Sequence, residues 1–144
     1  MDFWNEVSLG AHLVAALVLA LPTGWTSEKE SRTAGLRTFP LVSLGACAYI
    51  LIGQGFIPPD HPDAMARLLA GLLAGIGFIG GGAILKKENE VEGTAAAASI
   101  WITGAIGSAV ALNMFGIAII LAALNFCAVV FLGSAKRVLP DDES

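Results

Sequence analysis

The chain has 144 residues, of which 56% are hydrophobic and only 14% are charged, and its formal net charge is −4. A soluble domain carries roughly 25% charged residues, so the composition excludes an ordinary water-soluble globular protein. The charges lie in short clusters between long apolar runs, which is typical of a polytopic membrane protein. The sequence contains no basic patch that would indicate nucleic-acid binding.

Five apolar runs of roughly 18 to 20 residues follow one another, each long enough for a helix to cross the ~30 Å hydrocarbon core of a bilayer. They cover residues 7–25, 38–57, 68–85, 94–112 and 116–133. A helix satisfies its own backbone hydrogen bonds in lipid, whereas a lone strand does not. We therefore predict an all-α fold: a polytopic bundle of about five transmembrane helices within residues 1–137, then a short acidic cytoplasmic tail, residues 138–144.

The basic residues predict the orientation of the chain. The N-terminus carries Asp2 and Glu6 but none of the positive charge of a signal peptide, so the first run should remain in the mature protein. Five crossings place the first connector, the third connector and the tail on one side of the membrane. The basic residues there are Lys29, Arg32, Arg37, Lys86, Lys87, Lys136 and Arg137. Because cytoplasmic segments are rich in Lys and Arg, we predict an outside N-terminus and a cytoplasmic C-terminus.

The third run is the richest in glycine. Gly71 and Gly75 form one small-x-x-x-small pair, and Gly77 and Gly81 form another. Such pairs let two membrane helices approach closely, so we interpret this run as the central packing helix, with a dimer interface as one use of it. Alternatively, residues 80–82 distort the helix and expose backbone groups to an ion or small solute, as broken helices do in transporters.

The fourth and fifth runs add further packing candidates. Gly104 and Gly107 lie on a small-residue face, and the hydroxyl of Thr94 is expected to contact other helices rather than to catalyse a reaction. Asn125, in the middle of the fifth run, should bond another helix, with a substrate contact as the alternative. The packing or substrate-path candidates are Gly71, Gly75, Gly77, Gly80, Gly81, Gly82, Gly104 and Gly107.

Polar side chains at the ends of the runs are candidates for a vestibule. Thr38 fits a helix cap and Arg37 fits a side chain that reaches the headgroups; alternatively, Glu28 and Arg37 fold back beneath the glycine-rich helix. On the opposite side, Arg67 fits either an ion pair with Asp63 or a gate. The full candidate set is Glu28, Arg32, Arg37, Thr38, Arg67, Asp63, Thr94 and Asn125.

Catalysis and metal binding find little support in the sequence. There is no nucleophile–base pair, phosphate loop or cysteine–histidine cluster, so we expect no enzyme and no cofactor. Asp60, His61 and Asp63 lie in a proline-rich turn and are a weak metal signal, so no metal site is predicted. Cys47 and Cys127 lie inside apolar runs and are expected to be buried hydrophobic residues.

Three stretches in order resemble the MgtC/SapB family of bacterial inner-membrane proteins. The first is Ala34-Gly35-Leu36-Arg37-Thr38, and the second is Arg67 followed by the glycine-rich segment 75–85. The third is Gly93 with Ala97, Ala98 and Trp101. The C-terminal cytoplasmic domain of longer members has no counterpart, so we expect the short form of the family.

The chain departs from the family pattern at three places. Thr26-Ser27 stand where the family has a Glu-Arg pair, with Glu28 beside them, and Gly93-Thr94-Ala95-Ala96 replaces the usual Gly-Leu-Thr-Thr. Ala64 stands where an Asp usually precedes the arginine, with Asp63 one place earlier. The inherited polar positions are therefore altered, whereas the packing glycines are kept.

The resemblance implies an all-helical protein of the bacterial inner membrane. Some members are linked to growth at low magnesium, survival in macrophages and virulence, and binding of the membrane F-type ATP synthase is one mechanism proposed in the family. We therefore expect a non-enzymatic module that acts through helix packing, as a homodimer or with another membrane protein such as ATP synthase. The alternative is an ion or small-solute transporter that uses residues 80–82, with Glu28, Arg37 and Arg67 at its mouths.

The orientation can be tested by introducing single cysteines at the two ends of the chain. A membrane-impermeant thiol reagent added to intact cells should label the N-terminal cysteine and leave the C-terminal one unlabelled until the membrane is permeabilised, because an odd number of crossings separates the ends. Labelling of both ends from the same side would show that the number of crossings is even.

Overall fold

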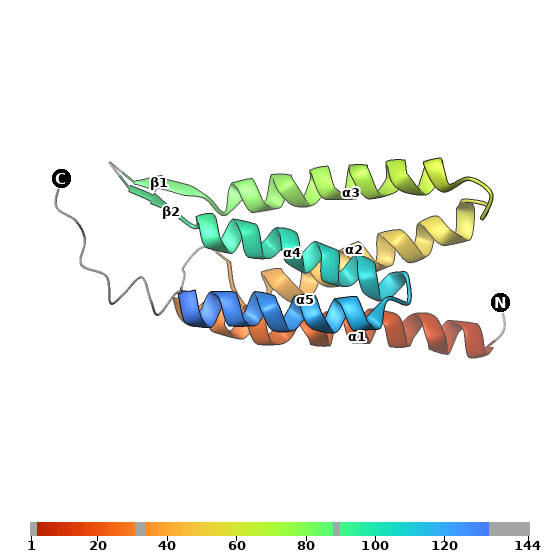
Figure 1. Ribbon diagram of the computed structural model, residues 1–144, viewed down its shortest axis with the longest axis horizontal. Coiled ribbons are helices and arrows are strands. Elements are labelled where there is room, and N and C mark those ends of the chain that lie inside the picture. The colour runs from red at the N-terminus through yellow and green to blue at the C-terminus, as the bar shows by residue number, and fades with distance from the viewer. Residues whose placement is uncertain (1–2, 31–33, 88–89, 133–144) are drawn as a thin grey trace.

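The computed structural model describes residues 3–30, 34–87 and 90–132, and five α-helices account for most of them (Figure 1). Two three-residue strands form an antiparallel hairpin between the third and fourth helices. The elements are α1 (Phe3–Glu30), α2 (Thr38–Phe56), α3 (Pro62–Gly82), β1 (Leu85–Lys87), β2 (Glu90–Glu92), α4 (Thr94–Ala111), α5 (Phe115–Cys127) and a π-helical continuation of α5 (Ala128–Leu132). The predicted all-α fold is confirmed.

Four of these helices, α1 to α4, are long and apolar enough to cross a membrane. The fifth apolar helix, Phe115–Phe131, is shorter. The helix in the third run begins earlier than predicted, at Pro62, because proline fits the first turn of a helix, where its missing N–H has no partner to lose. It also ends earlier, and Leu85, predicted to be helical, pairs with Glu92 in the hairpin.

The helices run alternately up and down, so the connections gather at the two ends of the bundle (Figure 1). The α1–α2 connection and the β1–β2 hairpin lie at one end, and the α2–α3 and α4–α5 turns lie at the other. Arg67, in the first turns of α3, therefore lies opposite Arg37 and Lys86, in agreement with the predicted segregation of charge. Arg32 and the predicted tail lie outside the described residues, and the direction of insertion stays a prediction.

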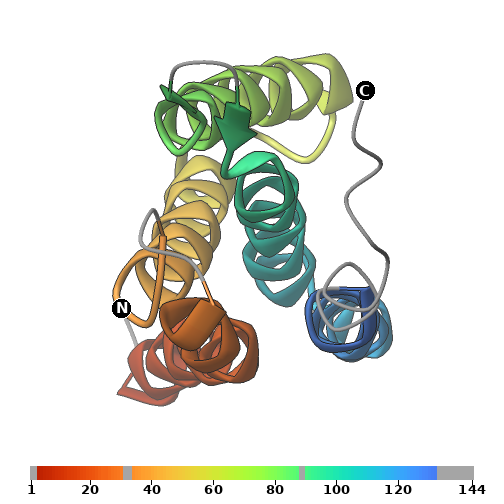
Figure 2. The ribbon, with the colours of Figure 1, turned by 90° about the vertical axis from the view of Figure 1, so that its left-hand side faces the viewer.

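Helix α4 is the centre of the bundle and contacts each of the other four helices. More than half of it, 56% of its apolar window, is buried, whereas only 11% of the α3 window is. The interpretation of the third run as the central packing helix is therefore wrong for the single chain. In the view along the helices, α3 lies at the edge of the bundle, against α2 and α4 (Figure 2).

The closest packing joins α2 and α4. A methyl group added to Gly107 would overlap the backbone carbonyl of Ser43, so the two backbones lie almost in contact. The Ser43 hydroxyl in turn donates a hydrogen bond of 2.7 Å to the carbonyl of Ala16 on α1. About one turn earlier on α4, Gly104 makes room for the side chain of Ile76 from α3. Small residues of α4 therefore set its distances to two neighbours.

The two cysteines differ in their surroundings. Cys47 on α2 is buried in the core, as expected, but Cys127 at the end of α5 is exposed, so the expectation of burial is wrong there. The reason is that α5 is covered on one side only: Ala118, Ala122 and Asn125 are its buried residues, and their spacing marks a single face.

Replacing Gly107 by alanine should destabilise the protein by about 1–3 kcal/mol, because the added methyl group must push two helix backbones apart. The measurement is the free energy of unfolding in detergent micelles. Gly10→Ala on α1 is the matched control, because a methyl group there meets no atom within 4 Å and alanine favours the helix. Equal stability of the two variants would contradict the close α2–α4 contact.

Candidate functional site

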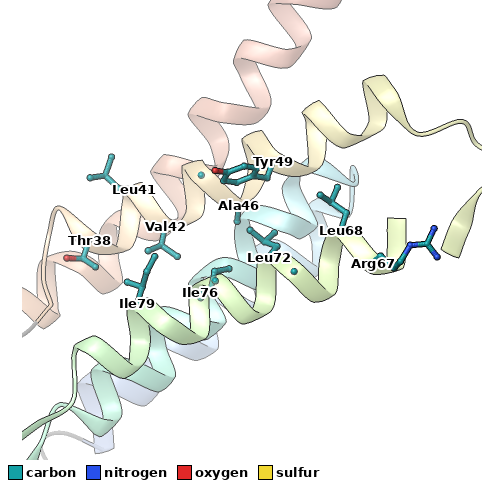
Figure 3. Close-up of a pocket in the computed structure, with 13 residues that line it drawn as sticks. Thr38, Leu41, Val42, Ala46, Tyr49, Arg67, Leu68, Leu72, Ile76 and Ile79 are labelled. Atoms are coloured by element: carbon teal, nitrogen blue, oxygen red, sulfur yellow. The ribbon is translucent and has the colours of Figure 1, made fainter. Parts of the chain in front are cut away.

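A groove between α2 and α3 is the main candidate site, and it encloses a cavity of about 850 Å³ (Figure 3). Its lining is apolar apart from Thr38, Tyr49 and Arg67. Thr38 and Arg67 lie at opposite ends of it. The α2–α3 groove is lined by Thr38, Leu41, Val42, Gly45, Ala46 and Tyr49 from α2 and by Arg67, Leu68, Gly71, Leu72, Gly75, Ile76 and Ile79 from α3.

Sequence spacing explains why these residues share one groove. On each helix they recur at intervals of three or four residues, which places them on one face. Near the turn the helices are close, because Gly53 of α2 makes room for the side chain of Leu68. Farther from the turn α3 diverges from α2 (Figure 1) and leans on α4, where a methyl group on Gly80 would lie 3.2 Å from the Ala97 carbonyl oxygen. The space left between the diverging helices is the groove.

The glycines of the groove have no packing partner among the residues that the structure describes. Methyl groups built on Gly45, Gly71 and Gly75 would meet no atom within 4 Å. They differ from Gly104 and Gly107 of α4, whose missing side chains are filled by neighbouring helices. Gly71 and Gly75, the first small-residue pair of the third run, therefore form part of an open, apolar surface.

Arg67 lies at one end of the groove with its guanidinium group pointing away from the cavity (Figure 3). It forms an ion pair of 2.8 Å with Asp63, four residues earlier on α3, and both side chains are largely exposed. Its aliphatic part therefore lines the groove, and its charge lies at the end of α3, where a side chain of this type reaches the membrane surface. This geometry agrees with the predicted ion pair with Asp63 and does not support the alternative of a gate.

The proposed vestibule of Glu28 and Arg37 does not form beneath α3. The Glu28 carboxylate accepts a hydrogen bond of 2.9 Å from the backbone N–H of Leu36 and so holds the α1–α2 connection. A methyl group at position 35 would overlap this carboxylate, so a larger residue there would displace the Glu28 side chain. Arg37 is exposed and does not line the groove, whereas Thr38 does.

Thr38 does not cap α2 with its side chain. Arg37 occupies the cap position, no side chain caps this end of the helix, and the Thr38 backbone N–H bonds the Gly35 carbonyl at 3.0 Å. The turn before α2 is therefore held by the backbone and by Glu28. Arg32, the remaining vestibule candidate in this connection, lies outside the described residues.

The glycine triplet forms the end of α3 and does not break it. The helix continues through Gly82, and the N–H groups of Ala83 and Ile84 donate to the carbonyls of Gly80 and Gly81 at 3.0 and 3.1 Å. The alternative in which residues 80–82 distort the helix within the membrane is therefore wrong, since glycine tolerates a helix as well as a break when its neighbours favour helix. A methyl group on Gly81 or Gly82 would meet open space.

Asn125 and Thr94 lie away from the groove. Asn125 is buried between α5 and α4, where its side-chain oxygen accepts a hydrogen bond of 2.6 Å from the Ser99 hydroxyl. Its amide also donates to the Ser99 carbonyl at 3.4 Å. Thr94 is exposed at the start of α4. Asn125 therefore has the helix-to-helix bond that satisfies a polar side chain in a membrane bundle.

The structure brings Thr38, Arg67, Gly71 and Gly75 together in one groove, with Asp63 beside it. Sequence reasoning missed the rest of the α2 wall. A usable signal was the apolar stripe Leu41, Val42, Gly45, Ala46 and Tyr49, which contains an unpaired glycine at helical spacing. Within the described residues, no group of three His, Cys, Asp or Glu side chains could hold a metal ion.

The fold and the site together define a polytopic helical membrane protein with a groove that is open and apolar. The sequence model of the MgtC family matches residues 13–138, most of the chain. The chain belongs to the MgtC family, and the resemblance found in the sequence is confirmed.

Several curated relatives give the same result. The chain is 34% identical over 126 residues to Protein MgtC of Salmonella typhimurium LT2, which is 88% of this chain and 53% of that protein. It is 31% identical over 112 residues to the Putative magnesium transporter YhiD of Escherichia coli K12, 74% of this chain and 52% of that protein. Protein SrpB of Synechococcus elongatus is 29% identical over 125 residues, 79% of this chain and 69% of that protein. The chain spans about half the length of the first two relatives. No solved structure matches.

Proposed function

We propose that this protein is a non-enzymatic membrane module whose α2–α3 groove receives an apolar transmembrane helix. The partner is a second copy of the chain or another membrane protein. The observation that carries the proposal is the combination of an apolar groove with glycines on both walls that no part of the described chain covers. Between membrane helices, close backbone packing replaces the hydrophobic effect as the driving force.

The dimensions of the groove support a helix as its occupant. Its lining extends from Thr38 to Tyr49 on α2 and from Arg67 to Ile79 on α3. At 1.5 Å per residue these stretches are about 16–18 Å long, or roughly three helical turns. The open glycines allow an incoming backbone to approach both walls, which a side chain at those positions would prevent.

The family resemblance suggests the setting in which such a module works. We propose the bacterial inner membrane as its location, with the N-terminus outside and the C-terminus in the cytoplasm. If the partner is another membrane protein, the candidate is the membrane ATP synthase. The proposed conditions under which the module acts are magnesium limitation or virulence. These assignments extend the coarser result that the chain is an MgtC-family membrane protein.

Photo-crosslinking tests whether a protein occupies the groove. Tyr49 lines it and is 60% exposed, so p-benzoylphenylalanine at this position replaces one aromatic ring by another. Irradiation of native membranes should give a protein adduct from position 49, because a partner helix would lie against the ring. Phe131, also exposed but near the end of α5, is the matched control and should give lipid adducts only. Lipid adducts alone from position 49 would contradict the proposal.

A magnesium transporter is the alternative that the name of the YhiD relative favours. Mg²⁺ binds six oxygen ligands and gives up its water reluctantly, whereas the groove lining contains no carboxylate and its one charged residue is the cation Arg67. We therefore expect reconstituted vesicles with an internal Mg²⁺-sensitive dye to show no uptake above that of protein-free vesicles. Protein-dependent uptake would favour the transporter.

A further inference from the structure

Helix α3 is poorly covered by the part of the chain that the structure describes. Ile76 and Gly80 are its buried residues. Its exposed residues include a seam at intervals of four, three and four residues: Gly71, Gly75, Phe78 and Gly82. Residues at this spacing lie along one side of a helix, as they do in paired helices. Phe78 in this seam is 85% exposed, and methyl groups on its three glycines would meet open space.

We propose that a second copy of this chain covers the seam, so that α3 of each copy lies in the α2–α3 groove of the other. This inference rests on the proposed function, because it uses the same groove and names the partner. Two α3 helices and two α2 helices then form a four-helix arrangement around a two-fold axis. The chain itself therefore contains both parts of this contact: the apolar groove and a helix, α3, with glycines along its exposed side.

The membrane fixes the direction of this axis. Both copies insert in the same orientation, so the two-fold axis must lie along the membrane normal and residues at equal depth meet. Gly71 and Gly75 of one copy then lie near the same residues of the other, where the backbones can approach. Phe78 of one copy likewise meets Phe78 of the other, between the glycines on either side of it in the two seams.

The charges at the end of the groove are compatible with a second copy. Arg67 is the charged residue of the lining, and equal depth would bring two such cations close together. Each is already paired with Asp63 at 2.8 Å, one turn nearer the end of α3. In the dimer each cation therefore keeps its own carboxylate, so neither copy brings an unpaired Arg67 to the contact. An anionic lipid headgroup at the same place would instead lie beside Asp63.

Disulfide crosslinking in native membranes tests this arrangement. In a background with Cys47→Ala and Cys127→Ala, Gly71→Cys and Gly75→Cys should each form a crosslinked dimer on oxidation. Gly77→Cys is the matched control: the same change on the same helix, also exposed and open, but on the opposite side from Gly75. Because disulfides form only between nearby Cα atoms, we expect about tenfold more dimer from position 75 than from position 77.

A second measurement does not depend on disulfide chemistry. In lipid nanodiscs, the fraction of dimer should fall for Gly75→Leu and stay unchanged for Gly77→Leu, and both variants should fold because both positions are open within the chain. Equal crosslinking at positions 75 and 77, or an unchanged dimer fraction in Gly75→Leu, would overturn the proposal. A Tyr49 photo-adduct with a different protein, together with no self-crosslinking, would overturn the dimer and leave the proposed function intact. Lipid adducts alone from position 49 would reject both.

Discussion

The near-contact of Gly107 on α4 with the backbone of Ser43 on α2 determines the arrangement of the remaining helices. In a bilayer, apolar side chains gain little by leaving lipid for protein, so close backbone packing and buried hydrogen bonds must hold helices together. The Ser43 hydroxyl extends this contact to Ala16 on α1. With α1, α2 and α5 gathered around α4, the place left for α3 is the edge of the bundle.

The same residue type therefore serves two purposes in neighbouring helices. The glycines of α4 are used within the chain, where Gly104 and Gly107 bring Ile76 and Ser43 close. Gly71 and Gly75 of α3 gain no such contact, although glycine in a helix costs about 1 kcal/mol relative to alanine in water. The proposed docking surface rests on this difference, because packing against a partner would offset a cost that no contact within the described residues offsets.

The sequence predicted the helices well but not their neighbours. Continuous apolar runs are sufficient to locate membrane helices, and α2 begins at Thr38 as the pattern indicated. A small-residue pair looks the same in sequence whether it faces the inside or the outside of the bundle. The sequence therefore did not indicate that α4, rather than α3, lies at the centre. One alternative placed Glu28 beneath the glycine-rich helix, but its carboxylate instead accepts a hydrogen bond from the nearby Leu36 N–H. Such local competition between partners is decided by three-dimensional geometry that residue types do not reveal.

The groove also determines how a partner can be selected. Its charge is confined to Arg67 at one end, so ionic contacts along most of its length cannot discriminate between helices. Selection must then come from shape, because an incoming helix with small residues at the depth of Gly71 and Gly75 can approach and one with large residues there cannot. The Arg67–Asp63 ion pair adds a requirement on orientation. A partner inserted in the opposite direction would have its own end charges on the far side of the membrane. A second copy of the chain meets both requirements by symmetry, whereas any other partner must carry a matching small-residue seam of its own.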